Sequence, residues 1–154
     1  MKIALGADHA GFSLKQKIKQ HLLSRGIQVD DLGTHSAESV DYPDFARRVG
    51  EEVAARQADC GILCCGTGIG MAIAANKVPG IRAANVHTEE EARLSREHND
   101  ANVLTLGGRT TEEGAALRIV DQWLDASFIG GRHERRVEKI SQIERAEARV
   151  LGTE

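Results

Sequence analysis

Aromatic residues, prolines and cysteines are scarce in this chain of 154 residues: aromatic residues make up 3%, and there are 2 prolines and 3 cysteines. So few aromatic rings leave little surface on which nucleic-acid bases could stack. An excess of basic charge is also missing, because 20 Lys and Arg stand against 23 Asp and Glu, for a formal net charge of -3. Proteins that bind nucleic acid through its phosphates usually carry a basic excess, so this class is disfavoured.

Long hydrophobic runs are absent too, since no apolar segment approaches the roughly 20 residues of a membrane-spanning helix. The opening segment MKIALGADHAG predicts a buried strand rather than a signal peptide, because its apolar stretch is short and soon interrupted. Cys60, Cys64 and Cys65 are odd in number and closely spaced, which suits reduced thiols in the cytoplasm better than a disulfide framework. A zinc site is not expected either, because no second pair of ligands follows the adjacent Cys64 and Cys65.

Short apolar segments alternate with longer amphipathic ones along the chain. The predicted strands are 2–6, 27–32, 59–65, 81–86 and 102–106, and helices are predicted between them, including one capped by Thr110 or Thr111 and one at about 132–150. This alternation predicts an α/β fold: a single domain over residues 1–154, with a Rossmann-like three-layer αβα sandwich, a five-stranded parallel sheet and a C-terminal helix.

Reactive side chains follow several of these strands, and in such folds ligands bind at the carboxyl ends of the strands. Asp8 and His9 follow the first strand, the segment at 65–70 follows the third, and Arg109 follows the fifth. The segment 98–100, His-Asn-Asp, ends the fourth helix. We expect all of these residues to gather on one side of the sheet.

The segment at 65–70, Cys-Gly-Thr-Gly-Ile-Gly, is the most informative. Gly66, Gly68 and Gly70 permit a tight turn whose amides approach an anion, although a turn without a ligand is the alternative. A dinucleotide-binding fingerprint is excluded because Met71 stands where its third glycine should fall, and a P-loop is excluded because Gly-Lys-Ser/Thr is absent.

Cys65 lies at the mouth of this turn, where the amides and the following helix favour a thiolate. Cys60 and Cys64 are predicted to belong to the core, which is the commoner fate of a cysteine. A thiolate next to Thr67 and the glycine amides suits the removal of a proton beside a carbonyl group, because the amides can stabilise the oxygen that becomes negative.

The other candidate site residues can also be explained without a functional role. His98 can move protons on a sugar hydroxyl, or it can simply cap a helix. Arg132 and Arg136 share a face of the last helix and suit a phosphate, or they belong to a solvated charged surface. Arg109 favours the interpretation as an anion pocket.

Five segments in order resemble the ribose-5-phosphate isomerase B family, which is related to the galactose-6-phosphate isomerase subunits, over nearly the whole chain. They are MKIALGADHAG, DYPDFA at 41–46, CGTGIGMAIAANK at 65–77, SREHNDANVL at 95–104 and GGRHERRVEKI at 130–140. One variant of that family has a glycine in place of the cysteine and a glutamate base six positions later; with Cys65 and Met71, this chain is similar to the cysteine type.

The resemblance implies an aldose–ketose isomerase of the pentose phosphate pathway that needs no metal or cofactor, binds neither nucleic acid nor membrane, and forms a homodimer or homotetramer with shared sites. The implied catalytic residues are Cys65 as the base, Thr67, His98 and Asp8. The implied substrate contacts are His9, Tyr42, Gly66, Gly68, Gly70, Asn99, Arg109, Arg132 and Arg136, and the last helix would bind phosphate and contact the partner.

The expected reaction is the conversion of ribose 5-phosphate to ribulose 5-phosphate through an enediolate. Isomerisation of allose 6-phosphate, galactose 6-phosphate or a tetrose phosphate remains open, because the catalytic loop does not sense chain length. A sugar-phosphate-binding protein without activity is a further alternative. A cysteine-dependent phosphatase is disfavoured, because its loop needs an arginine where this chain has Met71.

Overall fold

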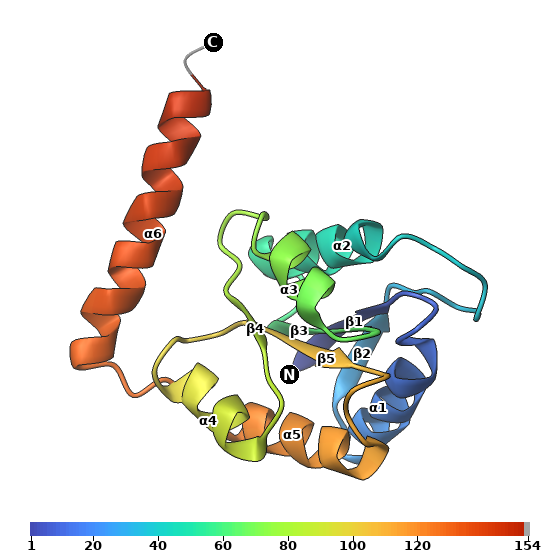
Figure 1. The fold of residues 1–154 in the computed structure, drawn as a ribbon. Helices are drawn as coiled ribbons and strands as arrows, with labels where there is room; N and C mark the ends of the chain where they lie inside the picture. The colour runs from blue at the N-terminus through green and yellow to red at the C-terminus, as the bar shows by residue number, and fades with distance from the viewer. Residues whose placement is uncertain (153–154) are drawn as a thin grey trace.

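The computed structural model describes residues 1–152; the predicted domain runs to 154, and residues 153–154 lie outside the described part. Its five strands form one parallel sheet in the order β2-β1-β3-β5-β4 (Figure 1). The strands are β1 (Lys2–Ala7), β2 (Gln28–Asp31), β3 (Cys60–Cys65), β4 (Ala83–Asn85) and β5 (Val103–Gly107). The helices are α1 (Phe12–Ser24), α2 (Tyr42–Ala54), α3 (Ile69–Ala75), α4 (Glu89–Glu97), α5 (Glu113–Asp125) and α6 (Arg132–Leu151). The predicted fold class is confirmed.

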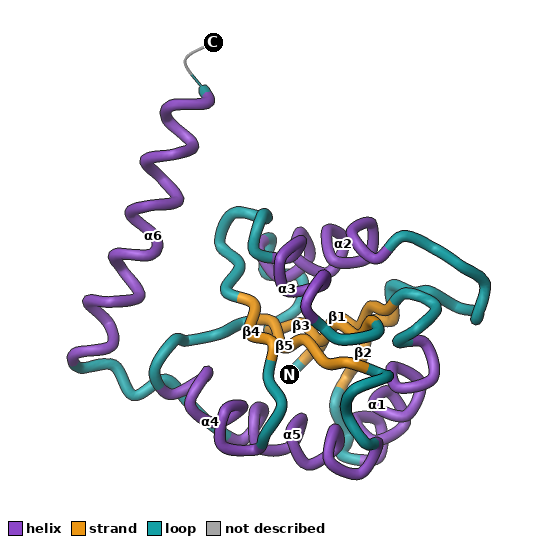
Figure 2. The backbone as a smooth tube through the Cα atoms, in the orientation of Figure 1, coloured by secondary structure: helices purple, strands orange, loops and turns teal. Residues whose placement is uncertain are grey.

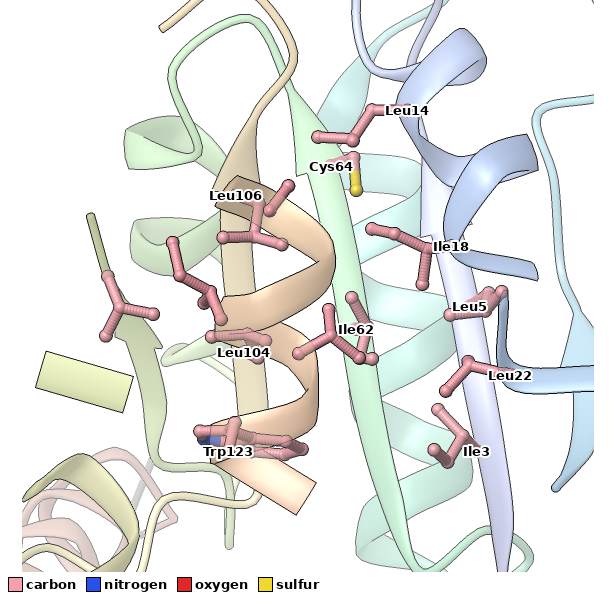
Figure 3. Packing of buried hydrophobic residues seen from close by; sticks show 14 of the residues in the cluster. Ile3, Leu5, Leu14, Ile18, Leu22, Ile62, Cys64, Leu104, Leu106 and Trp123 are labelled. Atoms are coloured by element: carbon pink, nitrogen blue, oxygen red, sulfur yellow. The ribbon is translucent and has the colours of Figure 1, made fainter. Parts of the chain in front are cut away.

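Helices cover both faces of the sheet: α1, α4 and α5 lie on one side, and α2 and α3 lie on the other (Figures 1 and 2). Alternating side chains of the central strands fill two separate cores, so that Ile62 and Cys64 belong to the first and Leu63 and Cys65 to the second. In the first core the strand residues pack against Leu14, Ile18 and Leu22 of α1 and Trp123 of α5 (Figure 3). These two cores hold the strand ends in place.

The strand order places a topological switch point between β1 and β3. The chain leaves β1 toward β2 on one side, and it leaves β3 toward the β5 and β4 side on the other. The loops after β1 and β3 therefore diverge at the carboxyl edge of the sheet, which is where ligands bind in open α/β folds.

The amino end of α5 is capped differently from the prediction. Thr110 or Thr111 was expected as the cap, but Glu112 is the capping residue, and its carboxylate accepts hydrogen bonds from the N–H groups of Gly114 (2.8 Å) and Ala115 (2.9 Å). The prediction was wrong because a glutamate two residues ahead of a glycine can fold back on the same amides that a threonine would cap.

Helix α6 projects from the rest of the molecule (Figure 1). One contact with the body is made by Glu144, whose carboxylate oxygens accept the N–H of Gly80 at 3.1 and 3.0 Å. Its apolar side chains Ile140 and Ile143 are 48% and 64% exposed. Within residues 1–152, none of the helices combines the length and hydropathy needed to cross a membrane.

Candidate active site

The loop after β1 is held by the carboxylate of Asp8. This side chain is buried, and its Oδ1 accepts hydrogen bonds from the N–H groups of Ala10 (2.9 Å) and Gly11 (3.0 Å). Gly11 in turn packs so closely on the backbone of Cys64 that a Cβ at this position would overlap it. Asp8 therefore fixes the loop against β3, in addition to any contact with a ligand.

The imidazole of His9 lies in the same loop with a defined tautomer. Its Nδ1 accepts a hydrogen bond from the N–H of Val40, with 3.2 Å between the nitrogens. A neutral imidazole that accepts at Nδ1 carries its proton on Nε2, which is then a donor. His9 thus has an N–H suited to an anion, and its orientation depends on Val40, a residue that the sequence patterns did not single out.

The thiol of Cys65, the last residue of β3, is held by the turn that follows. The N–H of Gly68, a residue with φ of +80°, donates to Sγ over 3.2 Å. The loop after β5 closes against the same turn: the N–H of Gly108 donates to the carbonyl of Cys65 (2.7 Å), and that of Arg109 donates to the carbonyl of Gly66 (2.9 Å). Backbone contacts from two loops therefore fix the sulfur at the carboxyl edge of the sheet.

The other two cysteines are confirmed as core residues. Cys60 and Cys64 belong to the core opposite that of Cys65. Burial raises the pKa of Cys60 to about 12, and burial likewise raises the pKa of Cys64. Both remain protonated thiols at neutral pH, so neither is suited to act as a base.

We expect iodoacetamide to alkylate Cys65 faster than Cys60 or Cys64 at neutral pH, because the raised pKa values of the other two suppress their thiolates. Peptide mass mapping of samples quenched over time measures the order. Replacing Cys65 with serine should remove the fast reaction, and faster labelling at either core cysteine would contradict the assignment.

Two side chains flank the glycine turn. A Cβ on Gly66 would meet Nη1 of Arg109 at 3.4 Å, and a Cβ on Gly70 would lie 2.6 Å from Cζ of Tyr42. The glycines thus leave room for a guanidinium group on one side and a phenol ring on the other. Thr67 is exposed between them. The structure therefore brings these predicted residues together around one turn.

Asn85, at the end of β4, belongs to this edge and was missed in the sequence. Its Oδ1 accepts a hydrogen bond from Oγ1 of the buried Thr105 (3.2 Å), and a Cβ on Gly68 would overlap the same oxygen. Asn85 therefore packs directly behind the turn that carries Cys65. The sequence did contain a signal for Asn85, because it is a polar residue at the carboxyl end of a strand, and ligands bind at the carboxyl ends of strands in such folds.

The expectation that His98 and Asn99 gather beside Cys65 is wrong within one chain. They follow α4 and lie beside the amino ends of β4 and β5: Nε of Arg82, directly before β4, donates to the carbonyls of Asn99 (3.2 Å) and Asp100 (2.9 Å). A helix that connects parallel strands runs antiparallel to them, so its carboxyl end returns to the opposite edge of the sheet.

The start of α6 is joined to this second edge. The N–H of Ile129 donates to the carbonyl of Glu97 (3.2 Å), and the ring of His133 stacks on His98 with 4.1 Å between centroids and 8° between planes. The site residues thus form two groups. The carboxyl-edge group is Asp8, His9, Tyr42, Cys65, Gly66, Thr67, Gly68, Gly70 and Arg109. The amino-edge group is His98, Asn99, Arg132 and Arg136.

Known proteins resemble this chain over nearly its whole length. The ribose-5-phosphate isomerase B of Escherichia coli K12 is 52% identical over 143 residues, which cover 93% of this chain and 96% of the relative. A ribose-5-phosphate isomerase B structure from Clostridium thermocellum superimposes with a TM-score of 0.95 at 56% identity, covering 96% of this chain and 99% of that one. The Mycoplasma genitalium enzyme, solved with bound ribulose 5-phosphate, gives a TM-score of 0.91 at 44% identity, covering 94% and 96%.

The sequence also matches the family model described as Ribose/Galactose Isomerase over residues 3–140. This match includes both groups of site residues. The chain belongs to the ribose/galactose isomerase family.

Proposed function

We propose that this protein is an aldose–ketose isomerase that interconverts ribose 5-phosphate and ribulose 5-phosphate, with Cys65 as the base. One observation carries the proposal: Sγ of Cys65 lies at the carboxyl edge of the sheet, 3.2 Å from the amide nitrogen of Gly68, with Arg109 beside the same turn. The names of the relatives and the ribulose 5-phosphate bound to one of them support the substrate.

The reaction is a proton transfer between adjacent sugar carbons. Cys65 removes the proton from C2 of the open-chain aldose, and the electron pair moves onto the carbonyl oxygen at C1 to give the enediolate. The N–H groups of the glycine turn, together with Thr67, stabilise that negative oxygen. Return of the carbon-bound proton from Cys65 to C1, and transfer of the proton of the C2 hydroxyl to the negative oxygen on C1, complete the ketose, so the sulfur ends as it began.

The phosphate group requires cationic or N–H donors at a fixed distance from Cys65. Nε2–H of His9 and the guanidinium of Arg109 supply donors from the carboxyl-edge group. Arg132 and Arg136, on successive turns of α6, suit bidentate binding of phosphate. Those two belong to the amino-edge group, so they cannot reach the same substrate from the same chain.

We infer that a second copy completes the site. The amino-edge group of one subunit, including His98 for opening the furanose ring and Asn99, meets the carboxyl-edge group of its partner, in a homodimer or in a homotetramer built from such dimers. The exposed apolar side chains of α6 suit burial against a partner. Residues 1–154 then act as one isomerase domain, and α6 is its phosphate-binding and dimer-forming arm.

We place the enzyme in the cytoplasm. Its three cysteines are free thiols, which fits a reducing compartment.

The proposal is tested by a metal-free isomerase assay with ribose 5-phosphate, allose 6-phosphate, galactose 6-phosphate and erythrose 4-phosphate. We expect kcat/KM to be highest for ribose 5-phosphate. A higher kcat/KM for another sugar phosphate would be consistent with the same mechanism but would identify that sugar phosphate as the substrate. Binding of all four sugars without turnover would instead identify a sugar-phosphate-binding protein.

A further inference from the structure

A buried imidazole in the amino-edge region has no role in the chemistry above. His133 is the second residue of α6, and it is 7% exposed, whereas Arg132 and Arg136 on the same helix are exposed. A buried polar ring in a helix that is otherwise largely exposed needs a reason, because desolvating an imidazole without a partner is unfavourable.

The partner of His133 is His98. Their rings lie nearly parallel, with centroids 4.1 Å apart. Gly130 and Gly131, with φ of +67° and +58°, make the turn that brings the start of α6 over the end of α4, and both tolerate this backbone because they lack a side chain. The hydrogen bond from Ile129 to the carbonyl of Glu97 holds the turn there.

The surroundings of His133 disfavour its protonated form. Burial, the neighbouring His98 and the charges of Arg132 and Arg136 lower the pKa of His133, in that order of importance. Its place in the first turn of a 20-residue helix acts in the same direction, since the amino end of a helix disfavours a cation. The carboxylate of Glu97, on α4 next to His98, accepts a hydrogen bond from Nη1 of Arg93 (2.5 Å), so this negative charge is paired with an arginine.

We propose that His133 is a positioning residue for His98: its stacked ring fixes the plane in which the His98 imidazole exchanges protons during opening of the furanose ring. The inference rests on the ring-opening role proposed for His98. His98 is only half-buried and follows the last turn of α4, so without the stack its side chain would rotate between rotamers. A misplaced proton-transfer group loses much of its catalytic effect.

The test compares His133→Ala, which removes the stack, with His133→Phe, which keeps a flat ring, on two substrates. Ribose 5-phosphate forms a furanose ring, whereas erythrose 4-phosphate cannot. We expect His133→Ala to lower kcat on ribose 5-phosphate by about 10- to 100-fold and to leave kcat on erythrose 4-phosphate near the wild-type value. His133→Phe should restore most of the loss, and His98→Asn should show the same preference between the two substrates.

Proton NMR of the His98 ring supplies a readout that does not depend on activity. The upfield ring-current shift of its carbon-bound protons should disappear in His133→Ala and persist in His133→Phe. Equal losses on both substrates, or no loss when the shift has disappeared, would overturn the positioning role. If wild-type protein showed the ring-current shift but isomerised no sugar phosphate, the proposed function would fail instead.

Discussion

Replacing Cys65 with serine should lower kcat for ribose 5-phosphate by about 10²- to 10⁴-fold, the range typical of a general base. Serine keeps the size and position of the side chain, but its hydroxyl does not ionise near neutral pH, so the proton on C2 is no longer removed. KM should change little, because the phosphate and hydroxyl contacts come from other residues. Steady-state kinetics with wild-type and variant enzyme measure both constants.

Cys64→Ala is the matched control, because the side chain of this neighbour belongs to the core on the opposite face of the sheet. It should lower thermal stability through the lost packing while leaving kcat close to wild type. Near-normal turnover by Cys65→Ser, or an equal loss in Cys64→Ala, would contradict the assignment of the base.

Mixing two inactive variants should restore activity. One subunit carries Cys65→Ser, and the other carries Arg132→Ala together with Arg136→Ala. In a mixed dimer, one site combines both defects and the other combines both intact edges, so we expect about half of wild-type activity per dimer. Coexpression with two different affinity tags, followed by tandem purification and assay, measures it.

The control is a dimer in which both subunits carry Cys65→Ser under the same two tags, which should stay inactive. If the mixed dimer is equally inactive while circular dichroism shows that it is folded, each site is built within one chain. That outcome would contradict the shared site, because it would require the two edges of one sheet to serve the same substrate.

Local patterns in the sequence were sufficient to predict the architecture of the fold. The apolar segment at 59–65 predicted β3 to within a residue, and Leu14, Ile18 and Leu22, spaced four residues apart, form the buried face of α1. These patterns work because burial on one face of a strand or helix imposes its period on the sequence. They failed at the start of α5, where a glutamate competes with two threonines for the same amides.

The cysteine–glycine turn of the proposed active site could also be predicted from the sequence, although the reasons for its glycines could not. Cys65 is identified by its position after a strand and before a glycine-rich turn, both of which are local features. That Gly66 makes room for Arg109 and Gly70 for Tyr42 depends on how loops distant in sequence pack together. The same holds for the hydrogen bond between His9 and Val40.

The sequence by itself determined the fold class, the cysteine loop and the identity of the cationic residues, because each is written in residues close together along the chain. Only the tertiary structure decided which of them meet. It placed His98 and Arg132 at the edge of the sheet opposite to that of Cys65, because α4 runs antiparallel to the strands and ends at the amino edge. It also stacked His133 on His98, a contact between helices whose facing sides depend on the packing of the whole domain.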